Sequence, residues 1–200
     1  KEAAIKKAKA LVNWQLVQIS EDEIYLPIEG MGLDFGGFGK EYAVDKVSSL
    51  LVDLSVENFL VDFGGDIFAA GHAAEECSWK VGIEIPEGNE RPAFVVNLTN
   101  RGLATSGNYR KFFDLNGKRY GHTIDHRTGY PTIHSELSAS LISSSCLKSG
   151  IASTACLMSG KQHALRMINS EWDLEGCLQS FDSPLLSNKF HTYLHNEGFH

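Results

Sequence analysis

The residues best suited to chemistry begin at a glycine-rich bend. Gly36 and Gly37 lie just before residues 38–54, and Gly39 lies at the start of this range. The apolar spacing of residues 38–54 predicts a helix. Glycines let a backbone approach a phosphate closely, and the start of a helix attracts anions. Lys40 would add a positive charge at the same place. The alternative is a tight strand-to-helix turn, which alone would account for two of these three glycines.

The bend matches neither of the two standard phosphate-binding loops. A Gly-x-Gly-x-x-Gly pattern begun at Gly37 and Gly39 would place its third glycine at Tyr42. A P-loop requires serine or threonine after Gly-Lys, whereas Glu41 follows Lys40. A phosphate site at this bend would therefore have a pattern of its own.

His122 is the residue best suited to proton transfer. The ordinary pKa of histidine is about 6.5, and a nearby carboxylate such as that of Asp125 can move it close to the working pH. The alternative is a partly buried histidine that hydrogen bonds hold in a turn. Asp125 and Arg127 could likewise do no more than close that turn by pairing with each other.

Three further segments contain small or hydroxyl residues of the kind found at binding sites. Asp66 follows a second glycine pair, where aspartate is also common as a turn or helix-capping residue. Thr105 and Ser106 lie in a short predicted strand and could equally be ordinary strand residues. Residues 149–155 begin a predicted helix that is rich in small side chains.

The elements that must position these groups are mostly short strands without helical connections. Apolar runs and alternating patterns predict a hairpin over residues 17–26 and strands over residues 59–63, 67–70, 79–85, 93–98, 103–105, 111–115, 118–121 and 137–142. Asn116 and Gly117 suit the turn of a second hairpin. Helices are expected over residues 3–13, 38–54, 149–158 and 162–168. This order predicts an α+β fold rather than a parallel sheet.

The helix over residues 38–54 is predicted to bury one apolar face. That face consists of Ala43, Val47, Leu50, Leu51 and Leu54. Lys40, Asp45 and Ser48 are expected to lie off it.

Composition limits the class of protein. The chain of 200 residues has 42% hydrophobic and 22% charged residues, which is typical of a globular protein, and we expect one domain over residues 1–200. Its net charge of −7 argues against general binding of nucleic acid. No apolar run is long enough for a membrane-spanning helix, and the four cysteines, which form no Cys-x-x-Cys pair, are interpreted as free thiols.

Five segments occur in one order between Met31 and Gly160. They are Gly-Gly-x-Gly-Lys-x-Tyr-Ala-x-Asp at the bend, Gly-Gly-Asp-Ile, Ser-Gly-Asn-Tyr-Arg, His-x-Ile-Asp-x-Arg-Thr-Gly and Ser-Thr-Ala. In these segments the chain resembles the ApbE family, the FAD:protein FMN transferases. One segment alone would be weak, whereas five in register make the resemblance specific.

The resemblance implies an α+β, T-fold-like domain of two lobes that holds FAD in a cleft between them. It implies Mg²⁺-assisted transfer of FMN from FAD to a threonine or serine hydroxyl of an acceptor protein, with release of AMP. The acceptor is typically a subunit of a membrane redox complex, and some relatives instead hydrolyse FAD to FMN and AMP. By analogy, we expect a periplasmic or membrane-anchored location.

The resemblance also implies roles for residues. The histidine at the position of His122 is tied to activity and flavin contact, and we take His122 and Asp125 as the candidate catalytic residues. Mg²⁺ would be bound by the Gly39 carbonyl together with Ser153 and Thr154. The residues expected at the cofactor are Gly36, Gly37, Gly39, Lys40, Tyr42, Asp66, Thr105, Ser106 and His122.

The chain departs from the family pattern at two places. Relatives carry an aspartate ligand of Mg²⁺ four residues before the threonine of the last motif, where this chain has Gly150. Without that charge, Mg²⁺ binding should be weakened or absent, unless a carboxylate arrives from elsewhere. Relatives also have an upstream portion, before the segment that matches Lys1 onward, which contributes flavin contacts.

Three functions are therefore open at this point. They are a flavin transferase, a module that binds FAD without turnover, and a relative that keeps the fold but binds no flavin. The retained motifs favour the enzyme.

Overall fold

The computed structural model describes residues 2–86, 92–108, 112–115, 118–132, 136–180 and 183–195. Its centre is a six-stranded sheet in the order β14-β13-β12-β7-β4-β3, in which every neighbouring pair is antiparallel. The strands are β3 (Phe59–Phe63), β4 (Asp66–Ala70), β7 (Arg101–Gly107), β12 (Glu136–Ser143), β13 (Glu175–Ser180) and β14 (Leu185–Leu186). The prediction of an α+β fold is confirmed, because helices pack on an antiparallel sheet.

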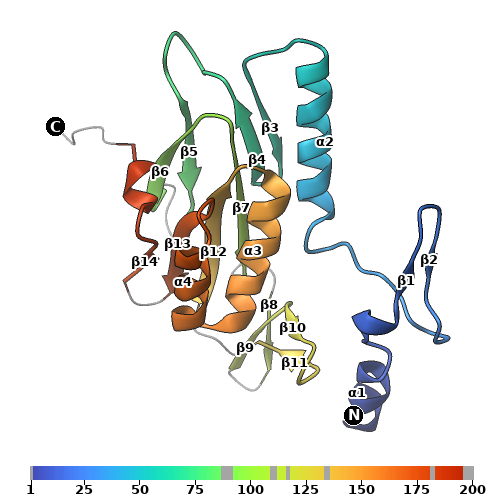
Figure 1. Ribbon diagram of the computed structural model, residues 1–200. Coiled ribbons are helices and arrows are strands. Elements are labelled where there is room, and N and C mark those ends of the chain that lie inside the picture. Colours follow the sequence, from blue (N-terminus) through green and yellow to red (C-terminus); the bar gives the residue numbers. More distant parts are fainter. Residues whose placement is uncertain are drawn as a thin grey trace.

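The sheet is covered on both faces. One face carries three helices (Figure 1), which are α2 (Gly39–Asp53), α3 (Cys146–Ser159) and α4 (Lys161–Ser170). The other face carries a hairpin, formed by β5 (Trp79–Ile83) and β6 (Phe94–Leu98). Successive strand residues point to opposite faces, so Ala104 of β7 packs with α2 while its neighbour Leu103 packs with the hairpin.

The predicted helices over residues 38–54, 149–158 and 162–168 correspond to α2, α3 and α4. The last two are separated at Gly160, whose φ of 77° an L side chain rarely adopts. The buried face of α2 agrees with the prediction in part, because Val47 and Leu51 pack against the core. Its fully buried residues are instead Glu41, Val44 and Ser48, while Leu50 is 57% and Leu54 is 65% exposed. Ser48 can be buried because its hydroxyl donates to the Val44 carbonyl at 2.8 Å and so has a partner.

Several small elements surround this body. They are α1 (Glu2–Lys9), the 3₁₀ turns η1 (Trp14–Leu16) and η2 (Phe190–Thr192), and the hairpins β1 (Gln18–Ile19) with β2 (Ile24–Tyr25), β8 (Phe112–Leu115) with β9 (Lys118–Gly121), and β10 (Ile124–Asp125) with β11 (Tyr130–Pro131). Figure 1 shows α1 and the β1–β2 hairpin apart from the sheet. Among the elements from α1 to β2, no residue is buried.

Both predicted hairpins form, with antiparallel pairing of β1 with β2 and of β8 with β9. The turn residues Asn116 and Gly117 lie outside the described residues. The predicted helix over residues 3–13 ends earlier, at Lys9. Strands β13 and β14 were not predicted, because residues 175–180 show no apolar alternation, although β13 lies between two other strands and is largely buried.

The cysteines are free thiols, as expected. Cys146, Cys156 and Cys177 are buried and Cys77 is exposed. Burial raises the pKa of Cys156 and of Cys177 to about 12, which makes these thiols unreactive. In the described part of the chain, no helix is both long and apolar enough to cross a membrane.

Candidate functional site

The glycine bend is held by hydrogen bonds within the bend itself. The Asp34 carboxylate accepts a hydrogen bond from Gly36 N at 2.8 Å, and the Phe35 carbonyl accepts from Gly39 N at 2.7 Å. The bend leads directly into α2, and Phe38, at the N-cap position, makes no side-chain hydrogen bond to that helix start. The N-cap side chain therefore satisfies none of the first-turn amide groups, although the Glu41 carboxylate forms a hydrogen bond with its own backbone.

The three glycines of the bend are not equivalent. None of them has a positive φ, so the backbone conformation does not require glycine. A Cβ at Gly36 would lie 3.0 Å from the Asp34 carboxylate, and one at Gly39 would lie 3.3 Å from the Phe35 Cβ, so close packing favours glycine at both. A Cβ at Gly37 would meet only Thr154, at 3.9 Å, an ordinary contact. Neither the turn nor the packing explains Gly37.

Lys40 and Asp66 form an ion pair between the first turn of α2 and the start of β4. The Asp66 side chain is 3% exposed and the Lys40 side chain 57% exposed. Burial lowers the pKa of Lys40, but the hydrogen bond to Asp66 and the charge of Asp66 outweigh it and raise that pKa above its ordinary value. The turn before Asp66 is closed by Asp62, which accepts from Gly65 N at 2.7 Å. Asp66 is therefore a partner of Lys40 rather than the turn residue.

Three hydroxyl groups meet between β7 and α3. The Ser106 hydroxyl lies 2.7 Å from the Ser153 hydroxyl and 2.9 Å from the Thr154 hydroxyl. Ser153 also donates to the Gly150 carbonyl at 2.9 Å. Because Thr154 faces Gly37, this cluster lies against the glycine bend.

Thr105 lies on the opposite face of the sheet from Ser106. Its hydroxyl is 2.8 Å from that of Ser140, its neighbour on β12, and Ser140 in turn pairs with Cys177 of the core beneath the β5–β6 hairpin. The two hydroxyls predicted to share one site are thus separated, because adjacent strand residues point to opposite faces.

Glu41 is a site residue that the sequence analysis did not identify. It is 5% exposed in the first turn of α2, and its Oε2 atom is buried without a hydrogen-bond partner in the described structure. Burial raises the pKa of Glu41; the charge of Asp66 raises it further, while a hydrogen bond to its own backbone and the charge of Lys40 lower it.

His122 lies in the segment that joins β9 to β10, and Asp125 is the last residue of β10. His122 is exposed, and its neighbours Gly121 and Thr123 both contact Asn108, which directly follows β7. Asp125 is bound to Arg127 by a bidentate contact of 3.0 and 2.9 Å, and it also accepts from Arg127 N. These hydrogen bonds lower the pKa of Asp125 to about 2. The turn-closing alternative for Asp125 is thus observed, and its catalytic role stays a prediction.

Tyr42 projects from α2 and is 51% exposed. The ammonium group of Lys46 lies 5.3 Å from the centre of its ring, one helical turn further on. The structure therefore leaves the Tyr42 ring accessible beside the glycine bend.

The motifs noted in the sequence are shared with a known family. Residues 1–178 match the ApbE family. The chain belongs to the ApbE family.

The chain is similar to ApbE relatives whose names state an activity. The chain is 35% identical over 137 residues to the FAD:protein FMN transferase of Haemophilus influenzae, a match that covers 68% of this chain and 40% of the relative. It is 34% identical over 154 residues to the protein of that name from Treponema pallidum, covering 72% of this chain and 42% of the relative. The chain therefore spans about two fifths of the length of these relatives.

ApbE structures share the fold. The apo flavinyl transferase ApbE of Pseudomonas stutzeri superimposes with a TM-score of 0.82 at 28% identity, covering 96% of this chain and 61% of that chain. The ApbE protein of Thermotoga maritima gives a TM-score of 0.86 at 24% identity, covering 98% of this chain and 64% of that chain. The predicted ApbE-like fold is confirmed.

Compared with the ApbE pattern, the structure brings together the bend, Lys40, Asp66, Ser106, Ser153 and Thr154. Among the described residues, no three histidine, cysteine, aspartate or glutamate side chains gather as a metal site. The cluster instead offers carbonyl and hydroxyl oxygens, with Glu41 as a nearby carboxylate.

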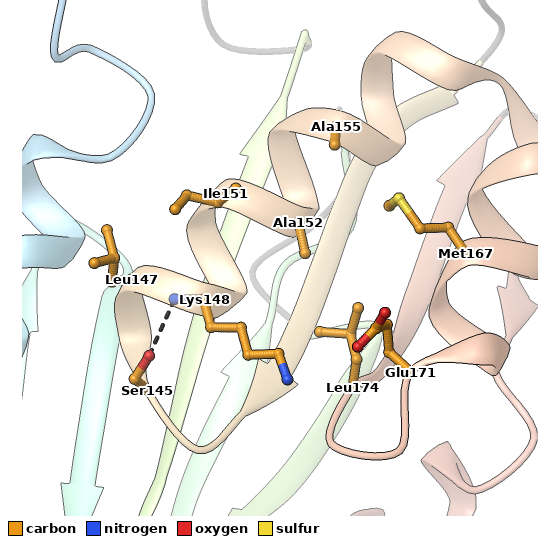
Figure 2. Close-up of a pocket in the computed structure, with 9 residues that line it drawn as sticks. All are labelled: Ser145, Leu147, Lys148, Ile151, Ala152, Ala155, Met167, Glu171 and Leu174. Atoms are coloured by element: carbon orange, nitrogen blue, oxygen red, sulfur yellow. Dashed lines mark hydrogen bonds between the residues drawn. The ribbon is translucent and has the colours of Figure 1, made fainter.

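An apolar groove lies on a different part of this ApbE-family fold. It has a volume of about 420 Å³, runs between α3 and α4 and is lined mostly by apolar groups, among them Ile151, Ala155 and Met167. Figure 2 shows these side chains, with Lys148 and Glu171 at the end of the groove nearer the start of α3. Apart from Ala155 of the Ser-Thr-Ala segment, the residues that line the groove lie outside the five family motifs.

Proposed function

We propose that this chain forms the diphosphate-binding part of a FAD:protein FMN transferase. The observation that supports the proposal most directly is Gly37. Nothing in the turn or the packing requires glycine there, yet it lies at an uncapped helix start and faces the hydroxyl of Thr154. Because glycine has no side chain, a phosphate group can approach the backbone closely at this helix start.

The reaction would exchange one phosphorus–oxygen bond for another. The hydroxyl oxygen of an acceptor threonine or serine forms a bond to the phosphorus of the FMN half of FAD. The bond from that phosphorus to the bridging oxygen breaks, and AMP leaves with the bridging oxygen. Catalysis of this kind depends mainly on positioning and on neutralising the diphosphate charge, which the α2 start and Lys40 can provide.

His122 is the proposed base that accepts the proton of the attacking hydroxyl. It is exposed, so an acceptor protein can reach it, and it is joined through Asn108 to the end of the strand that carries Ser106. Asp125 is engaged by Arg127 and would fix the turn that presents His122.

Mg²⁺ fits the donor atoms at this site, because all of them are oxygen atoms. The residues that would hold it include Gly39 through its carbonyl and Ser153 and Thr154 through their hydroxyls. When bound, Mg²⁺ would supply neutralisation of diphosphate charge. An acceptor in a membrane redox complex and a periplasmic location, both implied by the resemblance, stay predictions.

The test is to incubate the full chain with FAD, Mg²⁺ and an acceptor protein that one of these relatives flavinylates. Covalent flavin fluorescence on the acceptor, seen in a denaturing gel together with free AMP, is the expected result. Release of AMP without labelling would indicate FAD hydrolysis instead. Retained FAD with neither product would indicate a binding module.

His122→Ala should reduce labelling by at least about a hundredfold, which is typical for loss of a general base. FAD binding, measured by quenching of flavin fluorescence, should decrease much less. His126→Ala removes an exposed histidine of the same turn and serves as the matched control. Unchanged labelling by the His122 variant would exclude it as the base.

A further inference from the structure

The side chain of Glu41 fills the space that a side chain at position 150 would need. A Cβ added to Gly150 would lie 2.5 Å from the Glu41 Cγ and 2.8 Å from both its Cδ and its Oε1. Non-bonded atoms do not approach so closely, so position 150 accepts only glycine while Glu41 keeps this conformation. The residue that departs from the family pattern on α3 and this glutamate on α2 therefore fit each other in space.

The carboxylate of Glu41 is buried in a way that calls for a positive partner. The residue is 5% exposed, and within the described structure its Oε2 atom has no hydrogen-bond donor. The neighbouring cation, Lys40, is already paired with Asp66. A buried carboxylate oxygen without a donor is unfavourable, and a bound cation would supply what is missing.

The two helix segments that meet at Glu41 and Gly150 also carry the oxygen donors of the candidate metal site. Gly39 lies two residues before Glu41 at the start of α2, and Ser153 and Thr154 lie one turn beyond Gly150 on α3. The Ser106 hydroxyl joins Ser153 and Thr154 from the sheet. Carbonyl, hydroxyl and carboxylate oxygens together suit a hard divalent cation.

We propose that Glu41 is the carboxylate ligand of the divalent cation in this chain. It would supply from α2 the charge that relatives supply from α3 at the position of Gly150. The inference deepens the proposed function, on which it rests for the presence of a cation at this site. It replaces the expectation of weakened Mg²⁺ binding with a carboxylate provided by a different helix.

Mn²⁺ is a suitable probe, because the signal of the free ion in electron paramagnetic resonance disappears on binding. Binding to the full chain is titrated without FAD and then with saturating FAD. Glu41→Gln keeps the shape of the side chain and removes its charge, and it should weaken Mn²⁺ binding at least about tenfold, since ligand charge sets the affinity of such sites. Glu171→Gln, an exposed glutamate at the α3–α4 groove, should leave the affinity unchanged.

Exchange of the two positions gives a second, independent test. Gly150→Asp alone should lower the thermal midpoint, because the new side chain overlaps Glu41 and adds a like charge. In Glu41→Ala/Gly150→Asp the overlapping atoms are gone and a carboxylate is restored from α3. Mn²⁺ affinity should be as weak in Glu41→Ala as in Glu41→Gln, and the double variant should recover it to within about threefold of the parent.

Two results would overturn the inference. One is a parent chain that binds no Mn²⁺ in either condition, and the other is a folded Glu41→Gln variant that binds Mn²⁺ as tightly as the parent. Should the double variant not fold, the Glu41→Gln titration decides alone. Because the readout is metal binding, it is independent of transfer: Glu41-dependent Mn²⁺ binding without acceptor labelling would support the inference and contradict the proposed function.

Discussion

Helices α2 and α3 lie side by side on the same face of the sheet, but their N-termini are completed in different ways. The start of α3 is closed by protein side chains. Ser145 accepts from Lys148 N at 3.1 Å, and the two carboxylate oxygens of Asp45 accept from Cys146 N at 2.8 Å and Leu147 N at 2.9 Å. The start of α2 follows a glycine bend, and its N-cap residue, Phe38, makes no side-chain cap hydrogen bond.

The difference distinguishes a structural helix start from one that is available to a ligand. Both helix starts have amide groups without a partner inside the helix, and both are the positive end of a helix dipole. At α3 the negative partner is Asp45, which projects from α2 and so fixes the two helices against each other. At α2 the N-cap residue supplies no such partner, and Lys40 lies beside the positive end of the helix, as binding of a diphosphate would require.

The largest effect on stability is expected when the side-chain partners at the start of α3 are removed. Asp45→Ala removes the acceptor of two partly buried amide groups, and it should lower the free energy of unfolding by about 2 to 3 kcal/mol. Urea denaturation followed by circular dichroism measures this loss.

The matched control for Asp45 is Asp53→Ala, an exposed aspartate at the other end of the same helix. Its effect on the free energy of unfolding should stay within about 0.5 kcal/mol. Equal effects of the two substitutions would show that Asp45 does not complete α3.

A smaller effect, on FAD affinity, is expected when a side chain is added to the glycine bend before α2. Gly37→Ala adds a methyl group that the fold can accommodate at 3.9 Å from Thr154, so the free energy of unfolding should change by less than about 0.5 kcal/mol. The same methyl group would obstruct a bound phosphate, and FAD affinity should decrease about tenfold, equivalent to about 1.4 kcal/mol. Fluorescence titration with FAD and urea denaturation separate the two effects.

Gly32→Ala provides the comparison for Gly37. Gly32 has open space around its backbone and no positive φ, and it lies upstream of the bend. That variant should change neither FAD affinity nor stability appreciably. If Gly37→Ala bound FAD as tightly as Gly32→Ala, the α2 start would not be the phosphate site.

The fold could be predicted from sequence where local signals are strong. Strand β3 was predicted to the residue, because an apolar run ends at the glycine pair Gly64-Gly65, whose positive φ values form the turn to β4. Strand β13 could not be predicted, because its burial comes from its position between β12 and β14 in the sheet, which its own residues do not reveal. The face of α2 was predicted only in part: Val47 and Leu51 pack against the core, but Glu41 and Ser48 are buried by neighbours that no local pattern reveals.

The site shows the same limit. Its motifs predicted the residues that meet between α2, β4, β7 and α3, but not which of two neighbours points inward. Strand alternation, applied to Thr105 and Ser106, would have predicted that only one of them faces α3. Glu41 could not be identified from the sequence, because its candidate role depends on its contact with Gly150. The two residues are far apart in sequence and meet only when α2 packs against α3.

The smallest expected effect is a change of stability at acidic pH, and it again involves the start of α3. Asp173 is 8% exposed, accepts from Ser144 N at 3.0 Å and lies 3.6 Å from the Lys148 ammonium group. Burial alone would raise the pKa of Asp173, but the hydrogen bonds from Ser144 and the positive charges of Arg101 and Lys148 hold it below its ordinary value.

A carboxyl whose pKa is lowered by folding stabilises the folded state at pH values above its unfolded pKa, about 3.9. That contribution is lost as the pH falls through the lower, folded value. Asp173→Asn should therefore be less stable than the parent at pH 7, and the difference in urea midpoint should shrink steadily below about pH 4. Asp22→Asn, at an exposed turn position, should show no such difference at either pH. A gap for Asp173→Asn that stayed constant into acid would mean that its charge does not hold the start of α3, leaving Asp45 and Ser145 to close that helix.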